Sequence, residues 1–195
     1  MHLYDLARAA GPAPRAQAER REFRPVVRPG VTRIIEGMPH LPAFVKNERL
    51  DTLAANALGR ALFAPMYADP TTGANSARFA FLSPAARTFY TDWERVTYES
   101  VGVLCVAAGK NPYDRDLSNL IGELCTRSDI FRTMWGSHDV HVFREGTKRL
   151  EDGLSLVVYS APPNTAAEDA LKLLASWSAT AGQDHARDTD IPSTK

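Results

Sequence analysis

Two alternating segments joined by a turn place the strongest constraint on the fold of this chain. Residues 138–143, HDVHVF, alternate polar and apolar side chains as a strand does. Residues 151–153, EDG, are a turn signal, and residues 154–159, LSLVVY, read as a second strand. A two-stranded hairpin is only marginally stable by itself in water. The rest of the chain must therefore complete a sheet around it.

The N-terminal half supplies a second pair of strands. Residues 43–56 read as a tight hairpin that turns near Asn47. An amphipathic helix is predicted before it, over residues 28–39, and a short helix after it, over residues 56–63. Asn56 suits the N-cap of the short helix because its side chain can accept a hydrogen bond from a free backbone N–H.

The middle of the chain is predicted to be helical. Residues 64–78 read as a loop, and Ser83 followed by Pro84 indicates the start of a long helix. Gly109 stands where a glycine would end that helix. Two more helices are predicted over residues 114–128 and, capped by Ser128, residues 129–138.

The C-terminal region begins with a capping-box pattern. Thr165 and Glu168 fit T-x-x-E, and the helix that follows places Trp177 on its apolar face. Residues 179–195 are polar and are predicted to be a disordered tail. Strand pairs separated by a run of helices define an α+β fold, in which helices cover one face of an antiparallel sheet.

Charge and hydropathy argue against several functions. The 195 residues include 23 basic and 23 acidic side chains, so the chain lacks the basic footprint of a strong nucleic-acid binder. No membrane span and no apolar signal segment is visible. Cys105 and Cys125 read as buried reduced thiols, which fits a cytoplasmic protein.

No pattern of catalytic or metal-binding residues stands out. His138 and His141 are three residues apart on a predicted strand, so their side chains point to opposite faces. No acidic residue or cysteine accompanies them at the spacing of a metal site. The nucleophile elbow, the P-loop and the dinucleotide fingerprint are all missing. We therefore expect no enzymatic activity, no metal and no cofactor.

Four segments together resemble a known family. They are residues 28–63 (RPGVTRIIEGMPHLPAFVKNERLDTLAANALGRALF), 78–96 (RFAFLSPAARTFYTDWERV), 120–150 (LIGELCTRSDIFRTMWGSHDVHVFREGTKRL) and 156–177 (LVVYSAPPNTAAEDALKLLASW). In this order and spacing they are similar to the ligand-binding domain of MmyB-like transcription regulators, bacterial helix-turn-helix proteins of the XRE class. The resemblance covers about residues 23–178.

The resemblance implies a PAS-like antiparallel sheet packed against several helices, enclosing an apolar pocket for a small hydrophobic ligand, with a fatty acid as the best candidate. It also implies a homodimer, or a heterodimer with a full-length regulator. Residues 1–22 look like the remnant of a helix-turn-helix junction and linker, residues 23–178 like the ligand-binding domain, and 179–195 like the tail. The DNA-binding unit itself is not present, so direct DNA binding is not expected.

The chain departs from the family pattern inside the domain. Ala55 stands where the family typically has a tryptophan. The family also carries about twenty more residues between GTKRL and LVVY, and the loss of a strand would expose a sheet edge. A smaller sheet, a sheet completed by dimerisation and a decaying gene product all remain open. A second reading is accordingly a truncated interaction protein that pairs with a full-length regulator without binding ligand.

Large apolar side chains could fill the core or line a cavity between sheet and helices, where small-molecule sites commonly lie. The sequence does not separate these alternatives. From the elements that face each other in a PAS-like arrangement, we expect the ligand to contact Phe44, Leu53, Phe63, Trp93, Leu104, Phe131, Trp135 and Val158.

Overall fold

A computed structural model describes residues 27–137, 147–150 and 153–188. Its sheet is antiparallel and four-stranded, in the order β2-β1-β4-β3. The strands are β1 (Ala43–Lys46), β2 (Thr52–Ala55), β3 (Thr147–Arg149) and β4 (Ser155–Val158). The predicted N-terminal hairpin, β1 and β2, joins β4 through the central pair β1 and β4, and the fold is of the predicted α+β class.

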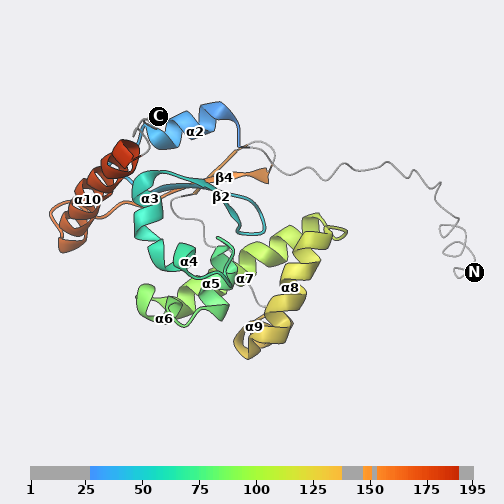
Figure 1. Cartoon of the computed structure of the whole chain (residues 1–195). Coiled ribbons are helices and arrows are strands. Elements are labelled where there is room, and N and C mark those ends of the chain that lie inside the picture. The colour runs from blue at the N-terminus through green and yellow to red at the C-terminus, as the bar shows by residue number, and fades with distance from the viewer. Residues whose placement is uncertain (1–26, 138–146, 151–152, 189–195) are drawn as a thin grey trace, which may run out of the picture.

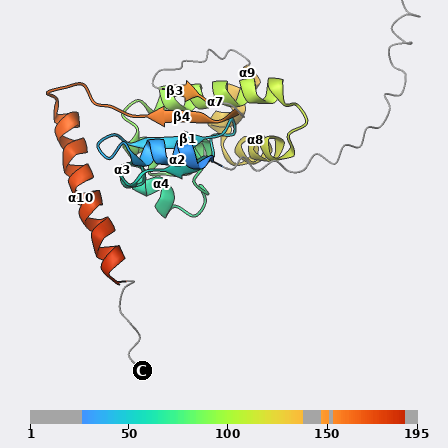
Figure 2. The same ribbon diagram turned by 90° about the horizontal axis from the view of Figure 1, so that it is seen from above.

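Helices flank the sheet and fill the long connection between β2 and β3 (Figure 1). Helix α2 (Pro29–Glu36) precedes β1, and α10 (Ala166–Asp188) follows β4. The connecting helices are α3 (Ala57–Leu62), α4 (Ala64–Ala68), α5 (Ser76–Leu82), α6 (Ala86–Phe89), α7 (Trp93–Lys110), α8 (Arg115–Arg127) and α9 (Asp129–Ser137). Seen from above, α10 lies at one end of the molecule and α8 toward the other (Figure 2).

Strand β1 is buried on both faces, although the sequence predicted helices on one face of the sheet only. Ala43 and Val45 pack with Ile35 of α2, whereas Phe44 packs with Phe63 and with residues of α4 to α6. Successive side chains of a strand point to opposite faces, so these two clusters lie on opposite sides of β1. All four residues of β1 are buried. The expectation of a one-sided sheet is therefore wrong at its centre.

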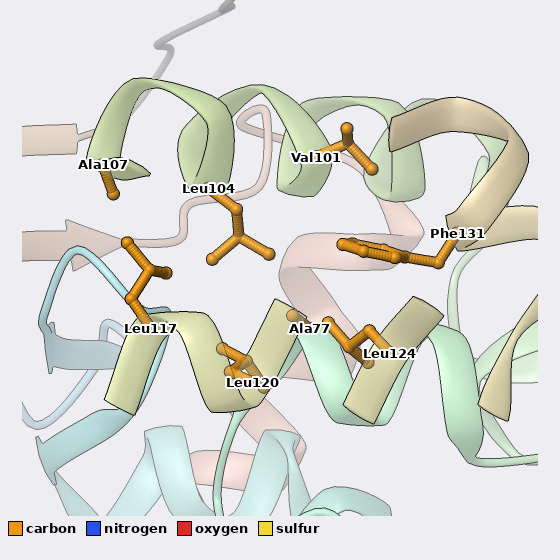
Figure 3. Close-up of a cluster of buried hydrophobic side chains, with 8 residues drawn as sticks. All are labelled: Ala77, Val101, Leu104, Ala107, Leu117, Leu120, Leu124 and Phe131. Carbon is orange, nitrogen blue, oxygen red and sulfur yellow. The ribbon is translucent and has the colours of Figure 1, made fainter. Parts of the chain in front are cut away.

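A third cluster is built almost entirely from helices (Figure 3). Leu104 of α7 and Phe131 of α9 face the apolar side of α8. The buried members are Ala77, Val101, Leu104, Ala107, Leu117, Leu120, Leu124 and Phe131. Helix α5 also contacts the sheet side of the molecule. The other helices of this cluster form a hydrophobic core that is separate from the sheet.

Two predictions about the connecting region are wrong. Residues 64–78 are not one loop but contain α4 and the start of α5. The long helix does not begin at Ser83, which instead ends α5; α7 starts at Trp93, where the Asp92 side chain accepts a hydrogen bond from the Arg95 amide at 3.2 Å. The start of the helix was predicted at the wrong residue because Ser-Pro and Asp-Trp both fit a helix start locally. Tertiary contacts decide between the two.

Several smaller predictions are confirmed. Asn56 caps α3, with its Oδ1 2.8 Å from the Gly59 amide, and Ser128 accepts a hydrogen bond from the Phe131 amide at the start of α9. Before α10, Thr165 Oγ1 accepts from the Glu168 amide as predicted, whereas the Glu168 carboxylate accepts from the amide of Asn164. That helix, however, continues to Asp188, past the point at which the polar tail was expected to begin.

The hairpin predicted over residues 138–143 and 154–159 also differs in the structure. Residues 138–143, the predicted first strand, lie outside the described residues. Its place beside β4 is taken by β3, from the segment that the sequence assigned to the connection. Gly153, with φ of +73°, occupies the turn, and the Leu150 amide donates to the Leu154 carbonyl at 2.8 Å. A glycine suits this position because side chains are strained at positive φ.

Candidate functional site

The predicted contact residues do not gather in one place. Phe44, Phe63 and Trp93 belong to the cluster between the sheet and α3 to α7. Leu104, Phe131 and Trp135 belong to the helical cluster of Figure 3, with the Phe131 and Trp135 rings stacked at 5.6 Å. Leu53 and Val158 pack on the α2 side of the sheet. A single small ligand would not reach all three clusters without large rearrangement, so the first cluster is the best candidate for a site.

The candidate site is rich in aromatic rings. Phe63 lies at the centre, with ring centroids 5.0 Å from Phe44, 4.9 Å from Phe89 and 5.7 Å from Tyr159. Most of these pairs are edge-to-face or tilted, the arrangement that aromatic quadrupoles favour. The ring contacts join Phe44, Phe63, Phe79, Phe89, Tyr90 and Tyr159. We refer to these six side chains as the aromatic cluster.

One ammonium group is buried against this cluster. Lys46, at the end of β1, is 8% exposed, and its Nζ lies 5.5 Å from the ring centroids of both Phe44 and Phe63. Nζ donates a hydrogen bond of 2.8 Å to Ser76 Oγ. Among the described residues no carboxylate forms an ion pair with Lys46. Burial lowers the pKa of its ammonium from 10.5 to about 8.

The sheet neighbours of Lys46 are residues with hydroxyl side chains. In the sheet Lys46 pairs with Thr52 of β2 on one side and with Ser155 of β4 on the other. Thr52 Oγ1 is a buried atom that has no hydrogen-bond partner within the described part of the chain. Buried hydroxyls without a partner are uncommon in folded proteins. Within the described residues, the end of β1 thus holds an ammonium without a carboxylate partner, and its cross-strand neighbour Thr52 holds a hydroxyl without a hydrogen-bond partner.

The fold holds Ser76 beside Lys46 through Asn75. The Asn75 side chain caps α5 by accepting from the Arg78 amide at 2.9 Å, and it donates to Asp51 Oδ1 at 2.7 Å. The Ser76 amide donates to the Leu50 carbonyl at 3.0 Å. These bonds attach the start of α5 to the β1–β2 turn. Ser76 is thereby held against the strand that carries Lys46.

A separate groove lies between α10, the end of α2 and the start of α3. Its volume is about 510 Å³, and Pro39, Leu58 and Ala175 contribute to its wall. Lys172 and Glu36 bring charge to its lining. None of the predicted contact residues lines this groove, and Lys46 does not either.

Other functional features are few within residues 27–137, 147–150 and 153–188. This part of the chain contains no group of three or more His, Cys, Asp or Glu side chains able to hold a metal. It also contains no helix with the length and apolar character needed to cross a bilayer. His138 and His141 lie outside the described residues. Cys105 and Cys125 are half-buried free thiols beside the helical cluster.

Sequence reasoning missed Lys46. A signal for it existed, because Lys46 stands two residues after Phe44 in a predicted strand, and alternation places both side chains on the same face. If Phe44 is buried, Lys46 must be buried or must end the strand. The hydroxyl of Ser76 could not be assigned from the sequence, since it reaches Lys46 only through a tertiary contact between residues 30 positions apart.

Within the described part of the chain, the aromatic cluster between the sheet and its helices has one buried charged side chain, Lys46, against it, an arrangement that suits the binding of a small molecule. Comparison with known families agrees: residues 27–152, well over half of the chain, match the ligand-binding domain of MmyB-like transcription regulators. The chain belongs to this family. Strand β4 and helix α10 lie beyond the matched residues. Neither the curated proteins nor the solved structures contain a significant match.

Proposed function

We propose that this protein is a non-catalytic sensory domain that binds a small, fatty-acid-like hydrophobic ligand within the aromatic cluster. Membership of the family supports a regulatory, ligand-binding role. The observation that carries the choice of site is the aromatic cluster itself, where Phe63 contacts rings from β1, α6 and the end of β4. Ligand pockets are typically lined by aromatic and aliphatic side chains with few polar groups.

A ligand could enter beside Tyr159. This side chain is 37% exposed, and its ring is 5.7 Å from the rings of both Phe44 and Phe63. It therefore stands between the surface and the inner rings. An apolar chain that displaced Tyr159 would replace ring–ring contacts by ring–chain contacts and would keep the core free of water.

The binding test compares two phenylalanines in different clusters. Phe63→Leu should weaken the binding of dodecanoate, measured by isothermal titration calorimetry, by about tenfold, which corresponds to about 1.4 kcal/mol. Phe131→Leu is the matched control, because Phe131 is equally buried but lies in the helical cluster. Equal loss in both variants, or no binding of any alkyl ligand to the wild-type protein, would contradict the proposed site.

Pairing of two chains is the second part of the proposal. Leu173 and Trp177 of α10 are 73% and 71% exposed and are four residues apart, so they share one helix face. The sequence predicted that Trp177 lies on the apolar face of its helix, and within this chain that side chain is exposed. We propose that a second copy, or a full-length regulator, covers this face. In the alternative function, the protein pairs with a full-length regulator without binding ligand, and the same surface would form that interface.

The pairing test measures mass in solution. Wild-type protein should elute as a dimer in size-exclusion chromatography with light scattering, and Trp177→Ser should elute as a monomer. Tyr113→Ser is the matched control, since Tyr113 is 90% exposed but lies between α7 and α8. A monomeric wild-type protein would exclude the homodimer. A dimer that survives in Trp177→Ser would move the interface away from α10.

A further inference from the structure

Lys46 differs from two other lysines of the chain in what surrounds its amine. Lys110 and Lys172 are exposed, and their ammonium groups pair with Glu48 at 2.7 Å and with Glu168 at 2.9 Å. Lys46 is buried, and among the described residues no carboxylate pairs with it. An ion pair stabilises the protonated amine, whereas burial without a countercharge favours the neutral amine. Of these three lysines, Lys46 therefore most readily presents the lone pair of a neutral amine.

The surroundings of the Lys46 amine suit an apolar electrophile. Nζ lies 5.5 Å from the ring centroids of both Phe44 and Phe63. The Phe63 ring in turn lies 5.7 Å from the ring of Tyr159, which is partly exposed. An alkyl chain on the Phe63 ring would thus reach from the surface to the amine. A lysine that is desolvated among apolar side chains is an activated nucleophile toward carbonyl groups.

Ser76 provides a proton-transfer group beside this amine. Its Oγ lies 2.8 Å from Lys46 Nζ, and the backbone amide of Ser76 is held by the Leu50 carbonyl at 3.0 Å. A hydroxyl can accept a hydrogen bond and can also donate one. Ser76 can therefore accept from the free amine and, after a reaction at Nζ, donate to a nitrogen that has lost its protons.

We propose that Lys46 is a Schiff-base site, which captures an aliphatic aldehyde as a reversible imine while the alkyl chain lies along Phe44 and Phe63. The lone pair of the neutral amine bonds to the carbonyl carbon, the C=O π bond breaks, and one amine proton moves to the oxygen. The hydroxyl so formed leaves as water with the second amine proton, and a C=N bond remains. This inference rests on the proposed function, because the alkyl chain occupies the ligand site proposed there.

The imine suits this position better than the ammonium does. An ammonium without a countercharge is unfavourable in a protein interior, whereas an imine is neutral. The imine nitrogen needs one hydrogen-bond donor, and the Ser76 hydroxyl is already in place. Apolar side chains around Nζ exclude the water that would hydrolyse the C=N bond. The bond is nevertheless reversible when the aldehyde is removed, as a sensory domain requires.

Reductive trapping of decanal on the full chain tests the assignment. Sodium cyanoborohydride converts an imine into a stable secondary amine, which peptide mass spectrometry then locates. Decanal should label Lys46 at least about tenfold more than Lys110 or Lys172, as expected for an advantage of about 1.4 kcal/mol. The Ser76→Ala variant should be labelled severalfold more slowly at Lys46, and Ser76→Thr, which keeps the hydroxyl, should restore the rate. Lys172→Met is the matched control and should leave the Lys46 adduct unchanged.

The amine of Met1 is an internal reference for proton affinity. An α-amino group has a pKa of about 7.7–8.0, close to the value of about 8 for Lys46. If proton affinity alone decided, decanal and propanal would label these two amines in the same ratio. Because the rings beside Lys46 hold a long chain, the ratio of Lys46 to Met1 labelling should be at least about tenfold higher with decanal.

The outcomes separate this inference from the proposed function. Calorimetric binding of decanol with no preferred labelling of Lys46 by decanal overturns the Schiff base and leaves the hydrophobic site in place. An equal ratio of Lys46 to Met1 labelling for decanal and propanal also overturns it, because the chain would then not lie on the rings. If decanol and dodecanoate do not bind and decanal does not label Lys46, the proposed function fails as well.

Discussion

The side-chain oxygen of Asn56 accepts a hydrogen bond of 3.2 Å from the backbone amide of Ala43, the first residue of β1. The same oxygen caps α3 at Gly59. The amide nitrogen of Asn56 lies within hydrogen-bond distance of three carbonyls at the end of α2 and just after it, those of Ile35, Met38 and Leu41. One buried side chain thus joins a helix end, a strand start and a helix start.

Asn56→Ala should lower the free energy of unfolding by at least about 3 kcal/mol. The loss combines an N-cap, worth about 1 kcal/mol, with buried backbone groups that lose their partner at about 1–3 kcal/mol each. Urea denaturation followed by circular dichroism measures the change. Asn119→Ala is the control, because Asn119 is exposed on α8 and its replacement should change stability by less than about 0.7 kcal/mol. Similar values for both variants would contradict the importance of Asn56.

Two glycine substitutions should have opposite effects. A Cβ at Gly59 would lie 3.0 Å from the Ala43 carbonyl oxygen and 3.0 Å from the Phe44 ring, so Gly59→Ala should destabilise the protein. A Cβ at Gly122, inside α8, would meet nothing within 4 Å. Gly122→Ala should stabilise the protein by about 0.5–1 kcal/mol, because alanine restricts the unfolded chain and favours the helix. Thermal unfolding of both variants gives the signs directly.

The buried lysine predicts an unusual dependence of stability on pH. Below pH 8, Lys46 is protonated in both states, and burial of its charge lowers the free energy of unfolding. Between about pH 8 and 10.5 the folded state loses this proton before the unfolded state does, so the penalty disappears as pH rises. The full difference is about 3 kcal/mol at 1.36 kcal/mol per pKa unit.

Lys46→Met isolates this contribution. The variant should be more stable than the wild-type protein at pH 7, and the difference should shrink by pH 10, when measured by urea denaturation at both values. Burial raises the pKa of Tyr90, Tyr159, Cys105 and Cys125, and these groups lower stability as pH rises in both proteins. The difference in stability between the variant and the wild-type protein therefore does not contain the contributions of these four groups. A difference that is constant with pH would show that Lys46 is solvated.

Trp135→Ala should separate stability from binding. Trp135 is half-buried and stacks on Phe131 within the helical cluster, so truncation should lower the free energy of unfolding by about 2 kcal/mol. Dodecanoate affinity should stay within about twofold of wild type, since the aromatic cluster is untouched. A large loss of affinity would instead restore the broader pocket, spanning several clusters, that the sequence predicted.

Local signals in the sequence predicted local structure well. The caps at Asn56, Ser128 and Thr165 were recognisable because a capping side chain lies within a few residues of the amides that it binds. The start of α5 was missed although Asn75 caps it locally, because residues 70–75 (PTTGAN) carry the composition of a loop. The expected polar tail overlaps α10, whose helical residues continue to Asp188.

The candidate site was predicted only in part. Size and hydrophobicity selected Phe44 and Phe63 correctly as core residues, but they also selected Leu104 and Phe131, which pack elsewhere. Large apolar side chains look alike in a sequence whichever cluster they join. The charge that makes one cluster distinctive, Lys46, was hidden because lysines are almost always exposed.

The order of strands in the sheet has a mechanical consequence. Ala43, where β1 begins, is paired with Val158, where β4 ends, whereas Lys46 is paired with Ser155 at the opposite end of the same two strands. Helix α2 leads into β1 and helix α10 follows β4, so both are attached at the Ala43–Val158 end. The central strand pair thus carries Lys46 at one end and the connections to both helices at the other end. A change in the separation of these two strands would therefore act on α2 and α10 together.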